Sequence, residues 1–180
     1  RRAEEVEPVI NAFTYRHFDE AMDKARKAEA KYTSGKRTRA LEGLPIGIKD
    51  ENFIAGKPTS SGSLIMKDFV ADKTSVGNER ILRAGGIVHA RTATPEFSSA
   101  GYTNSRLWGV TRNPWNPEFT PGGSSGGTAA SLAAGTSAIA TGSDIGGSIR
   151  IPAGPCGLVG YKPPYGRNSD DPPFNLDFYC

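Results

Sequence analysis

The chain has 180 residues and a mass of 19.1 kDa, with 37% apolar and 23% charged residues. This length gives room for one domain with a core, and the composition excludes a globally disordered chain. The net charge of +3 is supplied by residues 1–39, where basic and acidic residues are mixed. This mixed distribution predicts a solvated surface and no nucleic-acid partner.

Three further observations limit the class of protein. No apolar run approaches the roughly 18 residues of a membrane-spanning helix, and the first residues lack the apolar segment of a secretion signal. The two cysteines, Cys156 and Cys180, form no paired motif, which is typical of reduced thiols and predicts a cytoplasmic location. The two histidines, His17 and His89, have no companions at ligand spacing, so no metal site is expected.

Helices and strands are predicted to alternate along the chain. In chain order, we expect a helix over residues 14–31, a strand over 44–48, a helix from Ser75 to Gly85, a strand over 87–91, a helix over 128–134 and a strand over 137–141. Residues 94–121 hold four prolines and two tryptophans, which exclude long regular elements, and residues 144–155 are expected to form a glycine loop. The alternation favours an α/β fold.

Glycine is concentrated in one part of the chain. Eleven of the 22 glycines lie between Gly122 and Gly160, in two glycine–serine clusters flanked by apolar segments. A flexible linker would be polar throughout. The pattern instead indicates buried loops whose backbone closely approaches another group.

Several familiar site chemistries do not fit these clusters. Neither a GxxxxGK[ST] nor a GxGxxG pattern is present, which argues against nucleotide binding. The nucleophile-elbow pattern GxSxG occurs twice, around Ser124 and Ser125, but both histidines precede these serines instead of following them. The remaining candidate is a serine activated by a lysine.

Three segments resemble the amidase signature family in their order, their residues and their spacing. They are GLPIGIKD (43–50), PGGSSGGTAA (121–130) and GSDIGGSIRIPAGPCGLVGYKP (142–163), and the resemblance runs from about Asn11 to Gly166. It implies a mixed β-sheet core covered by helices. It also implies a Ser–cis-Ser–Lys triad, with Ser148 as the nucleophile, Ser124 as the bridging cis-serine and Lys49 as the base.

The resemblance implies further roles in the two glycine clusters. The backbone N–H groups of Ile145, Gly146, Gly147 and Ser148 would form the oxyanion hole. Asp144 and Arg150 would be a buried pair that braces this loop, and Gly123 would allow the cis peptide. Ser125 would either hold Lys49 or support the backbone, and the supporting role is favoured. Cys156 is expected to be a packed thiol, and Asp50 and Asn52 to be turn groups.

The chemistry requires a neutral lysine. The ordinary pKa of a lysine is about 10.4, and lowering it to about 7 means destabilising the ammonium by roughly 4–5 kcal/mol. Burial at the end of an apolar strand can do this. Ser124 would then relay a proton between Ser148 and Lys49. No cofactor is implied.

The sequence thus predicts an amidase that hydrolyses a small-molecule carboxylic amide through an acyl-enzyme on Ser148. A second interpretation is a glutaminyl-tRNA amidotransferase subunit. The chain's weak basic charge and the segment AGKPT (55–59), which looks more like free-standing amidases, argue against it. A third is a non-catalytic fragment with a binding role. A homo-oligomer is compatible with the sequence.

The resemblance also implies a domain organisation. The family's domain is more than twice the length of this chain. Residues 1–180 are therefore expected to be a single partial domain, with an N-terminal helical part over 1–40, a catalytic core over 41–166 and the start of the remainder over 167–180.

Overall fold

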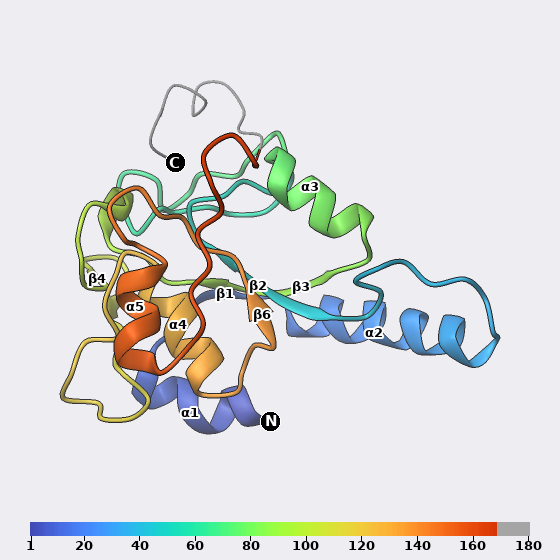
Figure 1. Ribbon diagram of the computed structural model, residues 1–180, viewed down its shortest axis with the longest axis horizontal. Coiled ribbons are helices and arrows are strands. Elements are labelled where there is room, and N and C mark those ends of the chain that lie inside the picture. Colours follow the sequence, from blue (N-terminus) through green and yellow to red (C-terminus); the bar gives the residue numbers. More distant parts are fainter. Residues whose placement is uncertain (169–180) are drawn as a thin grey trace.

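The computed structural model describes residues 1–168. A mixed sheet with helices on both sides forms its centre (Figure 1), which confirms the predicted α/β fold class. Within the described residues, no helix is both long and apolar enough to cross a membrane. The predicted start of a further segment at 167–180 lies almost wholly outside the described part of the chain.

Within the described part of the chain, the central sheet has four strands in the order β1–β3–β2–β6. Their bounds are Phe13–Arg16 for β1, Pro45–Lys49 for β2, Ile87–Thr92 for β3 and Ile139–Ala140 for β6. Strands β3 and β6 run parallel to β2, and β1 runs antiparallel to β3. The carboxyl ends of β2, β3 and β6 therefore share one edge of the sheet, where α/β proteins commonly place their sites. A second, two-stranded sheet joins β4 (Asn104–Ser105) to β5 (Gly109–Val110).

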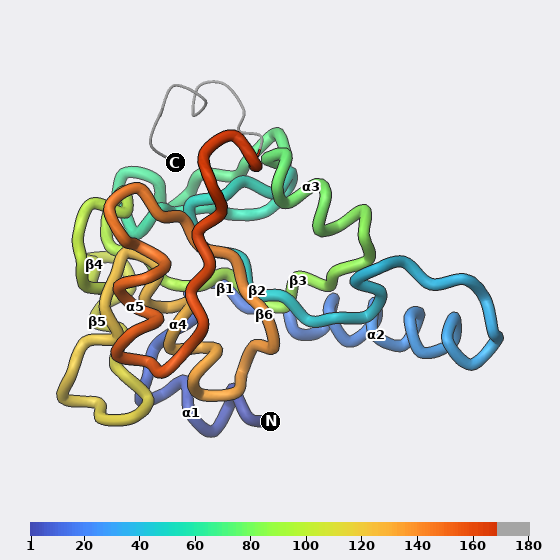
Figure 2. The backbone as a smooth tube through the Cα atoms, viewed as in Figure 1, coloured from blue at the N-terminus to red at the C-terminus, as the bar shows by residue number. Residues whose placement is uncertain are grey.

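In residues 1–168, five α-helices and one short 3₁₀ helix surround the sheet. Helix α4 contacts β2, β3 and β6 on one side and α5 on the other, so it lies between the sheet and α5 (Figures 1 and 2). The helices are α1 (Arg2–Ile10), α2 (Phe18–Thr33), α3 (Val76–Arg83), η1 (Glu96–Ser98), α4 (Gly126–Ala133) and α5 (Arg150–Cys156).

The predicted helix over residues 14–31 begins too early. Strand β1 takes residues 13–16, and the helix starts only at Phe18. The strand is held by β3, in which Thr92 and Ala90 lie opposite Phe13 and Arg16. These partners are more than 70 residues away, so helical spacing within the segment does not reveal them.

The predicted glycine loop over residues 144–155 is also partly wrong, because α5 occupies its second half. The Asp144 carboxylate accepts hydrogen bonds from the N–H groups of Ile149 and Arg150 at 3.2 Å, which satisfies donors that a helix start leaves unpaired. Pro152 stands in the first turn, where a missing N–H costs nothing. The helix ends at Gly157 with φ +67°.

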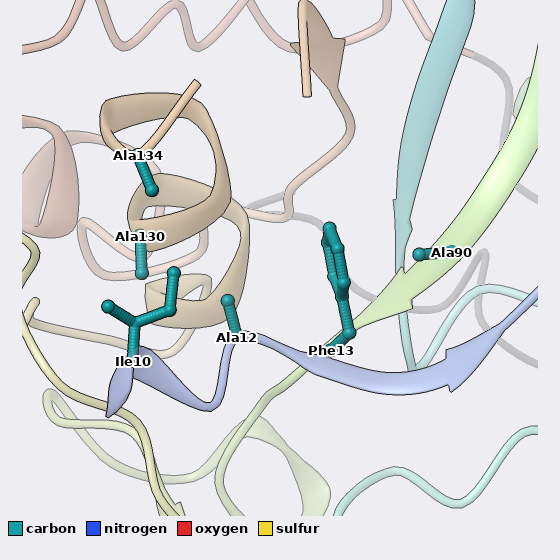
Figure 3. Close-up of a cluster of buried hydrophobic side chains, with 6 residues drawn as sticks. All are labelled: Ile10, Ala12, Phe13, Ala90, Ala130 and Ala134. Atoms are coloured by element: carbon teal, nitrogen blue, oxygen red, sulfur yellow. The ribbon is translucent and has the colours of Figure 1, made fainter. Parts of the chain in front are cut away.

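Two groups of buried apolar side chains flank the sheet. The first joins the end of α1, strands β1 and β3, and helix α4 through Ile10, Ala12, Phe13, Ala90, Ala130 and Ala134 (Figure 3). The second joins β2 and β3 to the α3 region through Ile46, Ile48, Ile54 and Val88. The small alanines on α4 allow its backbone to lie close to the sheet.

At Gly127, α4 lies very close to the backbone of neighbouring segments. The Gly127 N–H donates to the carbonyl of Ala93 at 3.1 Å. A Cβ at this position would lie 2.3 Å from the nitrogen of Ala93 and 2.6 Å from the oxygen of Ala12. Both are backbone atoms, so neither can rotate away. This bears out the expectation of a glycine-rich backbone in close contact with its surroundings.

Gly127→Ala should destabilise the protein by about 3 kcal/mol, because overpacking against backbone forces the helix away from the sheet. The free energy of unfolding from urea titrations measures this effect. Gly77→Ala is the matched control, since Gly77 lies in α3 and a Cβ there meets nothing within 4 Å. The control should be neutral or stabilise by up to about 1 kcal/mol. Equal stabilities of the two variants would contradict this account.

Candidate active site

Lys49 is the last residue of β2 and is fully buried. Its Nζ donates to Ser124 Oγ at 2.8 Å and to Ser143 Oγ at 2.7 Å, and it lies 3.3 Å from Glu51 Oε1. A lysine ammonium has three N–H donors. Two of these contacts are hydrogen bonds and the third is an ion-pair contact that opposes the buried charge.

Ser124 stands just before α4 and is 1% exposed. The peptide bond from Gly123 to Ser124 is cis. Gly123 itself lies against another segment, since a Cβ there would come within 2.7 Å of the backbone nitrogen of Tyr102. The Ser124 hydroxyl lies at the carboxyl end of β2, where it accepts the hydrogen bond from Lys49 Nζ.

Ser125 connects this segment to the loop that carries Ser148. Its N–H donates to the carbonyl of Ser148 at 3.1 Å, and its hydroxyl lies 3.4 Å from both the N–H and the carbonyl of Ser143. Ser125 therefore contacts the loop backbone. Ser148, at the other end of the loop, is partly exposed.

Asp144 organises the loop between β6 and α5. Its carboxylate accepts from Arg150 Nε and Nη2, both at 2.9 Å, and from the N–H of Gly147 at 2.8 Å. The hydrogen bonds from Arg150, ahead of those from the backbone, hold the pKa of the Asp144 carboxyl well below its usual range. Asp144 is buried, but the Arg150 side chain is 55% exposed, so the expected buried pair has only one buried member.

The predicted oxyanion donors differ in their surroundings. The N–H of Gly147 points at Asp144 and is already hydrogen-bonded there. Ile145 and Gly146, by contrast, are exposed on the outer part of the loop. Within this loop, Gly147 is therefore buried and held by Asp144, whereas Ile145 and Gly146 are exposed.

Sequence reasoning missed Ser143 and Glu51, both of which contact the Lys49 ammonium. Ser143 directly precedes Asp144, and its place in the second glycine–serine cluster was a usable signal. Glu51 lies two residues after Lys49, just beyond the strand, where a side chain can turn back. Its Oε2 accepts a hydrogen bond from the hydroxyl of Ser98 in η1.

Asp50 is more than a turn residue. It is fully buried, accepts hydrogen bonds from the N–H and hydroxyl of Ser60, and lies 3.7 Å from Arg91 Nη2. Burial raises the pKa of the Asp50 carboxyl to about 6, against the lowering effects of Ser60 and Arg91. Arg91 also donates to the carbonyls of Lys49 and Asn52. This pair anchors the backbone behind Lys49.

Other candidate groups have structural surroundings. Cys156 is buried, with its Sγ 3.7 Å from the carbonyl of Pro121, and burial raises the pKa of its thiol to about 11. A thiol in that state is a poor nucleophile, in keeping with its expected packing role. His89 packs against Phe13 and Phe18 and lies 3.1 Å from Ser137 Oγ. In residues 1–168, no three His, Cys, Asp or Glu side chains gather as a metal ligand set would.

A pocket of about 690 Å³ opens beside the Ser125 end of the candidate site, between α4, β6, α5 and residues 158–163. Ser125 and Gly142 belong to both the pocket wall and the site region. Most of the remaining wall is apolar, with Leu132, Ile139 and Leu158 among its residues.

Comparison with known proteins decides the family. A family model for amidases matches residues 1–176. The chain belongs to the amidase family. A structure described as a bacterial aryl acylamidase of the amidase signature enzymes shares 35% identity with it and superposes with a TM-score of 0.78, covering 84% of this chain and 32% of the other.

Two further relatives of this amidase-family chain cover nearly all of it. The glutamyl-tRNA(Gln) amidotransferase of Synechococcus sp. (strain CC9605) has one subunit that is 43% identical over 94% of the chain. A structure described as an inhibitor-bound vestigial protein complex that reveals the evolutionary origins of an s-triazine catabolic enzyme contains a chain that superposes with a TM-score of 0.89. The two chains share 35% identity, and the superposition covers 93% of this chain and 37% of the other. The chain spans about a third of the length of the curated relatives it matches, 34% for the Synechococcus protein.

Asp144→Asn should cost about 2 kcal/mol of stability at pH 7, because it weakens charge-assisted hydrogen bonds to Arg150 and to the start of α5. Because the folded-state pKa of Asp144 is depressed, this stabilisation is present above the unfolded-state pKa, about 3.9, and is lost as the pH falls below it. Urea titrations at pH 7 and pH 3 should show the difference from wild type shrinking at low pH. Asp68→Asn, at an 87% exposed side chain, is the control and should change little at either pH. A difference for Asp144→Asn that is independent of pH would contradict the assignment.

Proposed function

We propose that the protein hydrolyses a carboxylic amide to an acid and ammonia or an amine, through an acyl-enzyme on Ser148. The observation that carries the proposal is the buried hydrogen bond of 2.8 Å between Lys49 Nζ and Ser124 Oγ. It joins a lysine and a serine from two segments, 75 residues apart, that the family resemblance pairs in one triad. Membership of the amidase family supports the same reaction type.

In the first half-reaction, Ser148 Oγ attacks the amide carbonyl carbon and its proton passes through Ser124 to Lys49. The tetrahedral intermediate collapses with cleavage of the C–N bond. The departing nitrogen takes the proton back from Lys49 through Ser124. Ammonia or an amine leaves, and the acyl group stays on Ser148 as an ester.

In the second half-reaction, water attacks the ester along the same proton route. Its proton passes to Lys49 through Ser124, the C–O bond to Ser148 breaks, and the proton returns to Ser148 Oγ. The acid leaves and the starting state is restored. No step needs a cofactor.

The negative charge on the tetrahedral oxygen needs N–H donors nearby, since losing one such donor typically costs about 3–4 kcal/mol. We infer that Ile145 and Gly146, on the exposed part of the loop, supply these donors together with the N–H of Ser148. The bond from Gly147 to Asp144 supports a bracing role for Gly147. Arg150 and Ser125 hold the loop in place.

The remaining parts of the proposal concern the setting of the site. A small-molecule amide is the substrate, and residues 41–166 are the catalytic core of a partial domain, with residues 1–40 as its N-terminal helical part. A cytoplasmic location is favoured by the unpaired thiol of Cys156. Association into an oligomer fits the relatives, since one of them belongs to a multisubunit amidotransferase and another to a protein complex.

Ser148→Ala in the full-length protein should lower kcat for amide hydrolysis by at least about 10³-fold, because the nucleophile is lost. Ammonia or amine release from a panel of aliphatic, aromatic and peptide amides measures this. A fluorophosphonate probe should label Ser148 in the wild-type protein. Ser99→Ala is the control, since the Ser99 hydroxyl is exposed and bonds only the carbonyl of Glu96 among the described residues. Unchanged turnover in Ser148→Ala would overturn the nucleophile assignment.

A second candidate is the glutamine-hydrolysing subunit of an amidotransferase. The 43% identity to one subunit of a glutamyl-tRNA(Gln) amidotransferase favours it. This function predicts that the protein co-purifies with further chains of such a complex and releases ammonia from glutamine much faster in their presence. Affinity purification followed by a glutaminase assay, with and without the co-purified proteins, separates the two. Efficient turnover of other amides by the protein alone would favour the free-standing amidase.

A further inference from the structure

Glu51 is the acidic neighbour of the Lys49 ammonium. Its Oε1 lies 3.3 Å from Lys49 Nζ, and its side chain is 18% exposed. The other carboxylate oxygen accepts from the Ser98 hydroxyl, and Ser98 Oγ lies 2.8 Å from Thr94 Oγ1. The carboxylate is therefore held from the segment that follows β3, and its position beside Lys49 does not depend on a freely rotating side chain.

The other charges around Lys49 lie in two pairs, of which Arg91 is also attracted by the charge of Glu51. Asp50, next along the chain, faces Ser60 and lies 3.7 Å from Arg91 on β3. On the side of β6 and α5, Asp144 and Arg150 form a two-pronged ion pair at 2.9 Å.

Two further contacts of Lys49 Nζ come from neutral groups. They are the hydroxyls of Ser124, before α4, and Ser143, after β6. In the described part of the chain, Glu51 is thus the carboxylate in ion-pair contact with Lys49 Nζ.

Two opposing effects act on the lysine. Complete burial disfavours the ammonium, whereas an opposite charge within about 4 Å favours it, commonly by 1–3 pKa units. A base that must accept a proton from a serine relay needs a balance between the two, since a pKa near the working pH makes proton transfer efficient in both directions.

We propose that Glu51 is a positioning residue that holds Lys49 as an ammonium in the resting protein and so sets the pH at which activity begins. This inference rests on the proposed amidase function, in which Lys49 is the base. In the free protein, kcat/KM rises with pH as Lys49 loses its proton. Because of the Glu51 charge, this rise in kcat/KM occurs at a higher pH than burial of Lys49 alone would give. While Lys49 is protonated, Glu51 also keeps its Nζ directed toward Ser124.

The test is Glu51→Gln in the full-length protein, because glutamine keeps the shape and an acceptor for Ser98 but removes the charge. The acidic limb of kcat/KM should move down by about 1 pH unit or more. The titration midpoint of Lys49, followed by NMR with carbon-13 at lysine Cε and assigned with Lys49→Ala, should move down equally. Glu51→Asp keeps the negative charge but moves it farther from Lys49 Nζ, because aspartate is one methylene shorter. It should give a smaller shift in the same direction.

Glu96→Gln is the matched control. Glu96 also accepts from a serine hydroxyl, that of Ser63 at 2.7 Å, and it belongs to η1, the helix that holds Glu51 through Ser98. It should leave both readouts at their wild-type positions. Equal midpoints in wild type and Glu51→Gln, or an equal shift in Glu96→Gln, would overturn the proposal. If the wild-type protein hydrolyses no amide, the amidase proposal alone fails, and the NMR midpoint still decides the role of Glu51.

Discussion

The burial of the Lys49 ammonium is the constraint on which the arrangement around it depends. A charged amine out of contact with water is costly unless each donor finds a partner. The partners here come from three separate places: Ser124 before α4, Ser143 after β6 and Glu51 beyond β2. Segments far apart in the chain must therefore meet at one point, the carboxyl edge of the parallel strands.

The glycines allow that meeting. Gly127 brings the start of α4 against the backbone of Ala93 and Ala12, and Gly123 does the same against Tyr102. A side chain at either position would push the Ser124 segment away from β2. Since the hydrogen bond from Lys49 to Ser124 spans only 2.8 Å, a displacement of about one ångström would break it.

Sequence reasoning located the parts of this site but not all of their contacts. The buried strand ending at Lys49 and the small-residue helix α4 follow from local apolar patterns, and both are present. Strand β1 was missed because its partner, β3, is remote in sequence. Helix α5 was missed because prolines and glycines argue against a helix locally, while the capping by Asp144 that offsets them is a contact across the loop. The glycine–serine cluster pointed to the segment that holds Ser143, but motif spacing does not say which side chains turn toward a buried charge, so the contacts of Ser143 and Glu51 with Lys49 were missed.

The backbone behind Lys49 is fixed as firmly as its side chain. Arg91, buried between β2 and the segment that follows it, donates to the carbonyl of Lys49, and the Lys49 N–H donates to Thr141 Oγ1 at 3.1 Å. These two hydrogen bonds fix the backbone from which the buried Lys49 side chain extends, and so limit how far Nζ can move. The proposed reaction moves a proton to and fro at one atom, so a stationary Nζ keeps the serine relay at hydrogen-bond distance in both protonation states. The Asp50–Arg91 pair can therefore contribute to proton transfer through position alone, without touching a reacting group.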